Sequence, residues 1–277
     1  MPLADWAAFK LAYTNPRDTV IGNKGMVVTA KNFCSSWTQG PLNGVAPTAS
    51  VVPTKTTLGT YPFDNWQDAG SGNVYCLGGD LTSAGSFGLR QNGTFILADR
   101  LVHSGGLSGI VTTAQTTNLP TAALTRYTTG VGVLGYLEIY SNIGNTATTV
   151  TVSYTNQAAT AGKISLAQTF GGNDYNAAPR MVPIPLAAGD TGIRSVQSVT
   201  VLATTGTAGN FGVTLVKPIA IFAPSGDTAE QFDPVLSGNW CGIPPIQNGA
   251  CLQLITMTDG SGGFFNFNAA LSFAEIA

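Results

Sequence analysis

The sequence predicts an all-β protein built as an antiparallel β-sandwich or jelly roll. Many short segments alternate apolar and polar side chains, and Gly, Asn or Pro punctuates the chain between them. Period-two alternation is typical of half-buried strands, and many short strands with turn signals are typical of sandwiches and jelly rolls. Charged residues make up only 9% of the chain, against roughly 25% in an average soluble domain. Thr, Ser, Asn and Gly replace them, which suits flat, strand-rich surfaces.

Residues 131–154 are the segment around which we expect the fold to be organised. They form two alternating runs, with Asn142, Gly144 and Asn145 between them. Asn and Gly are favoured in connecting turns. The pattern therefore predicts two strands that form a central hairpin.

The other strands follow from the same alternation. They are expected at residues 26–30, 73–77, 94–103, 109–113, 163–170, 193–202, 211–222, 251–257 and 264–273. We expect the first long strand of the main domain to be broken near Asp99 and Arg100, and residues 211–222 to be interrupted at Pro218. Residues 118–127 are expected to form a short helix or a loop.

Two prolines restrict residues 181–186. Pro183 and Pro185 have no N–H to donate to a neighbouring strand. Proline within a sheet is confined mainly to edge strands, strand starts and bulges. The segment is therefore predicted to be an edge strand or an extended connector.

The chain is predicted to have three parts. Residues 1–90 hold an extended N-terminal arm and a Pro/Gly-rich loop region, residues 91–222 form the jelly-roll-like β-sandwich, and residues 223–277 are a C-terminal β extension. About 55 residues are marginal for an independent core, so the last part is expected to be an extension rather than a separate fold.

The arm and the loop carry aromatic side chains that favour packing. Residues 3–13 have a helix-compatible pattern with Trp6 and Phe9, which either covers the end of the protein's own barrel or docks on a neighbouring subunit. Residues 34–72 form an unusually long loop, which is typical of a functional loop or of one laid along another surface. The candidate contacts with a shell or with another subunit are Trp6, Phe9, Trp37, Tyr61, Phe63 and Trp66.

Composition limits the partners. The net charge is −2, the sequence pI is about 5.2, and the Lys and Arg residues never form a run. Nucleic-acid binding needs a clustered basic face, so no nucleic acid is expected. No window has the roughly 20 apolar residues of a membrane span, and the N-terminus lacks the features of a signal peptide. We expect synthesis in the cytosol, and the low charge indicates either an assembly protein or an unusually polar, uncharged secreted domain.

The cysteines predict neither a metal site nor a disulfide framework. Cys34, Cys76, Cys241 and Cys251 form no CxxC pair, and the only histidine is His103. Free, buried thiols are expected after cytosolic synthesis. A bridge between Cys241 and Cys251 across a hairpin is the alternative.

The search for catalytic residues favours a protein that is not an enzyme and has no cofactor. Asp227, Glu230 and Asp233 share one proline-bounded loop, so a solvated turn is expected rather than a glycosidase pair. His103 and Ser104 are adjacent on a strand and point to opposite faces, so they are not expected to act as base and nucleophile.

Four aromatic residues leave a choice between packing and sugar binding. Tyr61, Trp66, Tyr136 and Tyr140 would form a platform for a glycan if they were exposed. Tyr136 and Tyr140 stand at alternate positions of one strand, which favours packing in the sheet.

Three segments carry a resemblance to a known family. Residues 98–133, 151–162 and 183–215 resemble recurring segments of virion proteins of tailed bacteriophages. The resemblance spans about residues 90–222 and does not extend to residues 223–277. It implies a β-rich structural protein of the particle with no catalytic motif.

Together with the low charge, this resemblance leads us to expect a capsid decoration or cement protein on the head surface. Its partners would be the major capsid protein and copies of itself, with a trimer as one arrangement. The alternative is a β domain of the tail, collar or fibre that binds a host surface glycan. The main shell protein itself is a third option, although the sequence shows no pattern typical of a long amphipathic helix.

Overall fold

The computed structural model describes residues 17–28, 33–39, 43–61, 73–85, 93–222, 230–232, 244–258 and 263–276. The strands are β1 (Arg17–Val28), β2 (Phe33–Ser35), β3 (Asn73–Gly85), β4 (Gly93–His103), β5 (Leu134–Ser141), β6 (Thr148–Asn156), β7 (Lys163–Ile164), β8 (Gln168–Phe170), β9 (Arg180–Pro183), β10 (Ile193–Val201), β11 (Asn210–Phe222), β12 (Glu230–Phe232), β13 (Leu252–Thr258) and β14 (Gly263–Ile276). These ranges contain no helix. The prediction of an all-β fold is confirmed.

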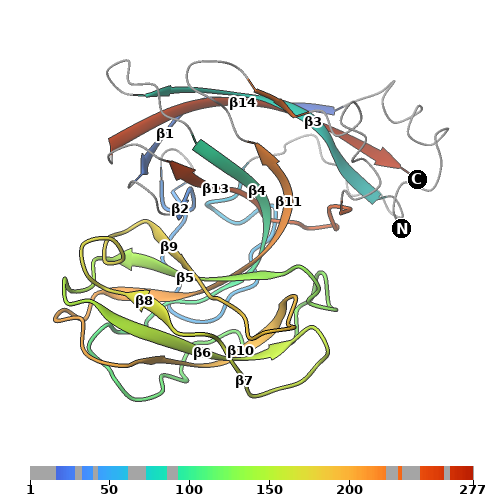
Figure 1. Ribbon diagram of the computed structural model, residues 1–277. Coiled ribbons are helices and arrows are strands. Elements are labelled where there is room, and N and C mark those ends of the chain that lie inside the picture. Colours follow the sequence, from blue (N-terminus) through green and yellow to red (C-terminus); the bar gives the residue numbers. More distant parts are fainter. Residues whose placement is uncertain are drawn as a thin grey trace.

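The strands form a closed barrel between two further sheets (Figure 1). The barrel has the order β11-β4-β13-β2-β9-β5. Above it in Figure 1 lies the terminal sheet, of order β1-β14-β3-β12, and below it lies the outer sheet, in which β6 pairs with β10, β7 and β8. The jelly-roll topology is therefore not confirmed, and the architecture is better described as a barrel with a sheet packed on each side.

The strands of the predicted central hairpin exist, but they do not pair with each other. β5 pairs with β11 and β9 in the barrel, whereas β6 belongs to the outer sheet. The connection at residues 142–147 therefore crosses from one sheet to the other. As a result β5 is buried on both faces, and Leu137 and Ile139 face the outer sheet while Tyr136 faces the barrel interior.

The two predicted strand interruptions are bulges within continuous strands. The register between β4 and β11 shifts between Arg100 and Val102, and again opposite Ile219, directly after Pro218. A bulge adds one residue to a strand and increases its twist without ending it. Asp99 and Arg100 therefore lie inside β4, on opposite faces.

The segment predicted to lie at a sheet edge forms a strand of the barrel wall with a neighbour on each side. β9 pairs with β2 on one side and with β5 on the other, and Pro183 is its last residue. A proline at the end of a strand removes no interior hydrogen bond, so the segment is not confined to an edge. The region at residues 104–133 is a long connection without a strand, so the strand expected at residues 109–113 does not form.

The predicted division at residues 90 and 222 does not follow the sheets. The barrel includes β2 from the N-terminal part and β13 from the C-terminal part, and the terminal sheet pairs β1 with β14. In that pair Arg17 lies opposite Phe273, and Val28 lies opposite Gly263. Segments far apart in the sequence are therefore interleaved within one structure.

Two apolar cores lie on either side of the barrel. One fills the space between the barrel and the outer sheet, with Phe170 and Phe211 in edge-to-face contact at 4.9 Å between ring centroids. The other lies under the terminal sheet and contains Leu97, Leu254 and Phe273. The barrel interior forms a third, smaller cluster that gives way to polar side chains.

Candidate functional site

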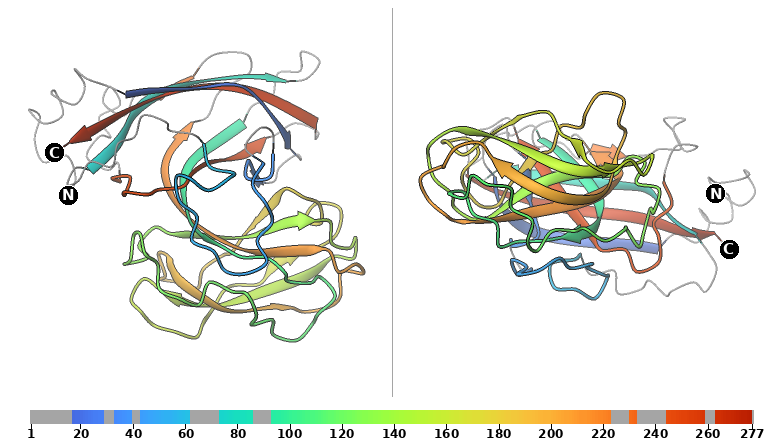
Figure 2. Two further views of the ribbon diagram at one scale, coloured as in Figure 1. Left: turned by 180° about the vertical axis from the view of Figure 1, so that it is seen from behind. Right: turned by 90° about the horizontal axis from the view of Figure 1, so that it is seen from below.

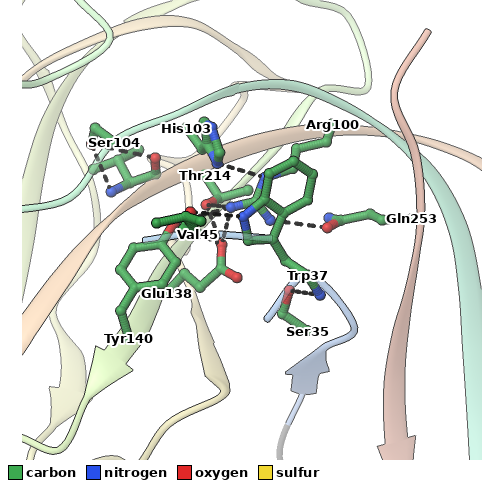
Figure 3. Close-up of polar contacts among 11 residues, drawn as sticks. Ser35, Trp37, Val45, Arg100, His103, Ser104, Glu138, Tyr140, Thr214 and Gln253 are labelled. Atoms are coloured by element: carbon green, nitrogen blue, oxygen red, sulfur yellow. Dashed lines mark hydrogen bonds and ion pairs between the residues drawn. The ribbon is translucent and has the colours of Figure 1, made fainter. Parts of the chain in front are cut away.

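The polar part of the barrel interior is built around Arg100. The inward face of β4 carries Ile96 and Ala98 and then Arg100, which is fully buried (Figure 3). Arg100 Nη2 donates to Glu138 Oε2 at 2.6 Å, and Nη1 donates to Gln253 Oε1 at 2.9 Å. A buried guanidinium is tolerable only when it is paired and hydrogen-bonded, and here strands β4, β5 and β13 supply the partners.

Hydroxyl groups complete this network around Glu138. Glu138 Oε2 accepts from Thr214 Oγ1 at 2.5 Å and from Tyr140 Oη at 3.2 Å. Burial by itself would lower the pKa of Arg100, but the charge and the hydrogen bond of Glu138, together with smaller contributions from Tyr140 and Cys251, outweigh it, so the pKa of Arg100 is raised and the side chain stays charged. The ion pair is therefore fixed within the barrel.

Trp37 closes this network from the side of the N-terminal segment. Its ring lies over the Arg100 guanidinium at 4.4 Å and meets His103 edge-on at 4.8 Å between centroids. Gly44 and Gly59 lie so close to the ring that a Cβ on either would stand 2.7 Å from ring atoms. The two ends of the loop at residues 43–61 therefore converge on Trp37.

The same loop is held at its centre by a second buried ion pair. Arg126 donates to both carboxylate oxygens of Asp99, at 2.8 and 2.9 Å, and its Nη2 also donates to the carbonyl oxygen of Pro53 at 3.1 Å. Val51 and His103 exchange backbone hydrogen bonds at 2.9 and 3.0 Å. One guanidinium thus joins β4, the connection at residues 104–133 and the loop.

This clamped loop, residues 43–61, turns aliphatic side chains outward. Val45 and Leu58 are each 70% exposed, and Val51 and Val52 are also exposed. Figure 2 (left) shows the loop lying along the outside of the barrel. Its ends and centre are held by buried groups while these four aliphatic side chains remain exposed. We call Val45, Val51, Val52 and Leu58 together the loop face.

His103 belongs to the buried network rather than to a catalytic pair. Its Nδ1 accepts from Arg100 Nε at 3.0 Å, and burial together with the Arg100 charge lowers the pKa of His103 to about 2. Ser104 instead exchanges hydrogen bonds with the backbone of Val213. His103 therefore stays neutral and acts as an acceptor.

The structure places the predicted contact residues differently from our expectation. Trp37 and Tyr61 are internal, so in this structure their side chains anchor the loop and are not available to a neighbour. Trp6, Phe9, Phe63 and Trp66 lie outside the described residues. The sequence does not single out the exposed aliphatic residues of the loop face, because isolated Val and Leu residues among Pro and Thr give no signal for contact.

The residues of the other functional interpretations are also accounted for. Tyr136 and Tyr140 point into the barrel, as packing predicts, and with Tyr61 internal the described residues offer no glycan platform of this set. Burial raises the pKa of Tyr136 to about 12. Glu230 begins β12, whereas Asp227 and Asp233 lie outside the described residues.

Cys34, Cys76 and Cys251 are buried, and none of the three forms a disulfide bond, as expected for buried thiols. The alternative bridge between Cys241 and Cys251 is wrong, because Cys251 is free; Cys241 itself lies outside the described residues. Burial raises the pKa of the Cys251 thiol to about 12.

Within the described ranges, no group of His, Cys, Asp and Glu side chains is arranged to hold a metal ion. The same ranges include no helix with the length and hydropathy needed to cross a membrane.

Comparisons with known proteins give only remote similarities. No family model matches the chain, and no curated protein matches it. Among solved structures, that of the infectious bursal disease virus Gt strain is 8% identical, with 94% of this chain and 81% of that chain covered and a TM-score of 0.20. The crystal structure of the VP2 subviral particle of the same virus is 10% identical, with 95% and 81% covered and a TM-score of 0.19. TM-scores of this size do not establish a shared fold.

Proposed function

We propose that this chain is a non-enzymatic structural protein of a tailed-phage particle, a decoration or cement protein that binds the outside of the head and stabilises the shell. The observation that supports this most directly is the loop face. A loop held at its ends by the buried Trp37 and at its centre by the buried Arg126–Asp99 ion pair carries four exposed aliphatic side chains. Ordering such a surface in advance lowers the entropic cost of binding.

The distribution of charge agrees with this role. Asp99, Arg100, Arg126 and Glu138 are all buried in ion pairs, so four of the chain's 26 charged residues do not contribute to the surface. The surface is left with little of the repulsion that keeps proteins apart. The proposed partner of the loop face is the major capsid protein, and neither nucleic acid nor membrane is proposed as a partner.

Binding to shells tests this role directly. Purified chain is mixed with heads of its phage that lack it, and bound protein is measured by co-sedimentation. Leu58→Asp should reduce binding at least tenfold, because it places a charge in an apolar contact. Val131→Asp is the matched control, since Val131 is exposed outside the loop. If both variants bound as well as the native chain, the loop face would not be part of the contact with the shell.

The number of copies in purified particles tests the location. Quantitative mass spectrometry against the major capsid protein should give a ratio near one or a simple fraction of the lattice. A few copies per particle would instead place the chain at the collar, tail or fibre. Absence from particles would overturn the proposal altogether.

A further inference from the structure

The outer sheet has an unusual solvent face. Along β6 the side chains of Val150, Val152 and Tyr154 are buried against the barrel. The alternate side chains on β6 and β10 point the other way, and most of the half-buried ones are hydroxyl groups. Gln197 lies among them and donates to Thr155 Oγ1 at 3.1 Å. We call the hydroxyl-bearing residues the hydroxyl face: Thr149, Thr151, Ser153, Thr155, Ser198 and Thr200. Figure 2 (right) views the molecule from the side of this sheet.

Exposed aliphatic side chains border the hydroxyl face. Leu202 is 74% exposed, and its amide donates to the Thr149 carbonyl oxygen at 2.9 Å. Ile164, on the opposite border, lies across from Ser153 in the β6–β7 pairing and is 54% exposed. Leu166, near it in the chain, is 59% exposed. Water solvates these large side chains poorly, and covering them would stabilise the protein.

Charged side chains are nearly absent from this part of the molecule. Between residues 104 and 216 they are Arg126, Glu138, Lys163, Asp174, Arg180, Asp190 and Arg194. Of these, Arg126, Glu138 and Arg180 are buried. Two of the others belong to the strands of the outer sheet and are engaged: Lys163 Nζ in β7 lies 3.6 Å from Asp190 Oδ2, and Arg194 Nε in β10 donates to the Thr128 carbonyl oxygen. The hydroxyl rows themselves carry no charge.

This chemistry identifies one kind of partner. A hydroxyl group both donates and accepts, so a row of hydroxyl groups can hydrogen-bond to an identical row. A contact about a two-fold axis brings the same patch of both subunits together and must be self-complementary. A patch of Lys or Asp would repel its own copy, whereas an uncharged hydroxyl face with aliphatic borders does not.

We propose that the outer sheets of two copies of this chain pack face to face, with the hydroxyl faces at the centre and Leu202, Ile164 and Leu166 at the borders. The contact is separate from the loop face. It requires only that two copies meet, so it stands or fails independently of binding to a shell.

The test is the mass of the full chain in solution, measured by sedimentation velocity at concentrations of about 1–100 µM. The native chain should form a dimer as concentration rises. Thr151→Lys should weaken the dimer at least tenfold, because Thr151 pairs with Thr200 in the middle of the sheet and two ammonium groups would then meet. Thr48→Lys is the matched control, because Thr48 is an exposed hydroxyl residue of the loop at residues 43–61. Circular dichroism shows whether each variant is folded.

A mixing experiment makes the result specific to a self-complementary face. Thr151→Lys and Thr151→Glu should each be monomeric alone and should form a dimer when mixed. A native chain that is monomeric throughout, a trimer, or a dimer equally strong in Thr151→Lys would overturn the inference. Assembly only after addition of another capsid protein would do so as well.

Discussion

The barrel interior and the core between the barrel and the outer sheet share strands β4, β5, β9 and β11 but are stabilised by different interactions. On β5, Leu137 and Ile139 enter a wholly apolar core, while Glu138 enters a network in which five polar side chains surround Arg100 with hydrogen bonds. Apolar contacts tolerate many arrangements of similar volume. A buried ion pair tolerates few, because each unpaired group costs its full desolvation energy. The core towards the outer sheet buries more apolar side chains than the barrel interior, whereas the polar network of the interior limits how the barrel can close.

Removing the charge of Arg100 should have the largest effect on stability and should show most clearly how the two regions differ. Arg100→Met should lower the free energy of unfolding by about 3–5 kcal/mol, because Glu138 is left buried without its cation. Urea denaturation measures this. Arg100→Met combined with Glu138→Leu is the control and should recover most of the loss, since neither charge is then unpaired. A double variant no more stable than the single one would show that the network contributes by shape rather than by charge.

Lowering the pH should reduce the stability of the protein through its single histidine, His103. The folded-state pKa of His103 is lowered to about 2 by burial and by the Arg100 charge, whereas an unfolded histidine titrates near 6.5. The unfolded chain therefore binds the proton first, and stability that is fully present above pH 6.5 is lost as the pH falls below it. At pH 5 the loss should be about 2 kcal/mol.

His103→Asn is the control for this pH dependence, because its amide oxygen can still accept from Arg100 but does not titrate. Its unfolding free energy should be nearly flat between pH 7.5 and pH 5, when followed by urea denaturation. An unchanged slope in that variant would assign the effect to carboxylates elsewhere in the chain.

A conservative change in the apolar core should have the smallest effect. Phe211→Leu should cost about 1 kcal/mol, since it keeps an apolar group of similar volume and loses the edge-to-face contact with Phe170. Thermal unfolding measures this against the native chain. A loss as large as that of Arg100→Met would mean that the two regions are equally intolerant.

The alternation of residues predicted the strands but not the faces they present. On β6 and β10 the apolar residues do face the core, because each strand has one buried side. On β5 the sequence shows Tyr136, Glu138 and Tyr140 on one face, which is indistinguishable from an ordinary solvent face. Only the closed barrel makes that face internal, and closure depends on β2 and β13, which are separated by more than two hundred residues.

The loop face was beyond prediction for a related reason. Trp37 and Tyr61 indicated correctly that the Pro-rich loop packs on something, but a sequence does not say whether the surface it meets belongs to the same chain. The partners are Arg100 and residues of β13, which lie far away in sequence. Local pattern therefore located the loop, and only the tertiary structure showed which side of it is free.

The pairing of β1 with β14 has a mechanical consequence. Because Arg17 lies opposite Phe273, the chain enters β1 and leaves β14 at the same end of the terminal sheet. A force that pulls on these two points would load the hydrogen bonds one at a time, like a zipper, rather than all together in shear. The barrel and the outer sheet, which lie between these strands in the sequence, would bear no tension until the two strands had parted. The terminal sheet would then act as a mechanical fuse that yields at low force and shields the rest of the molecule.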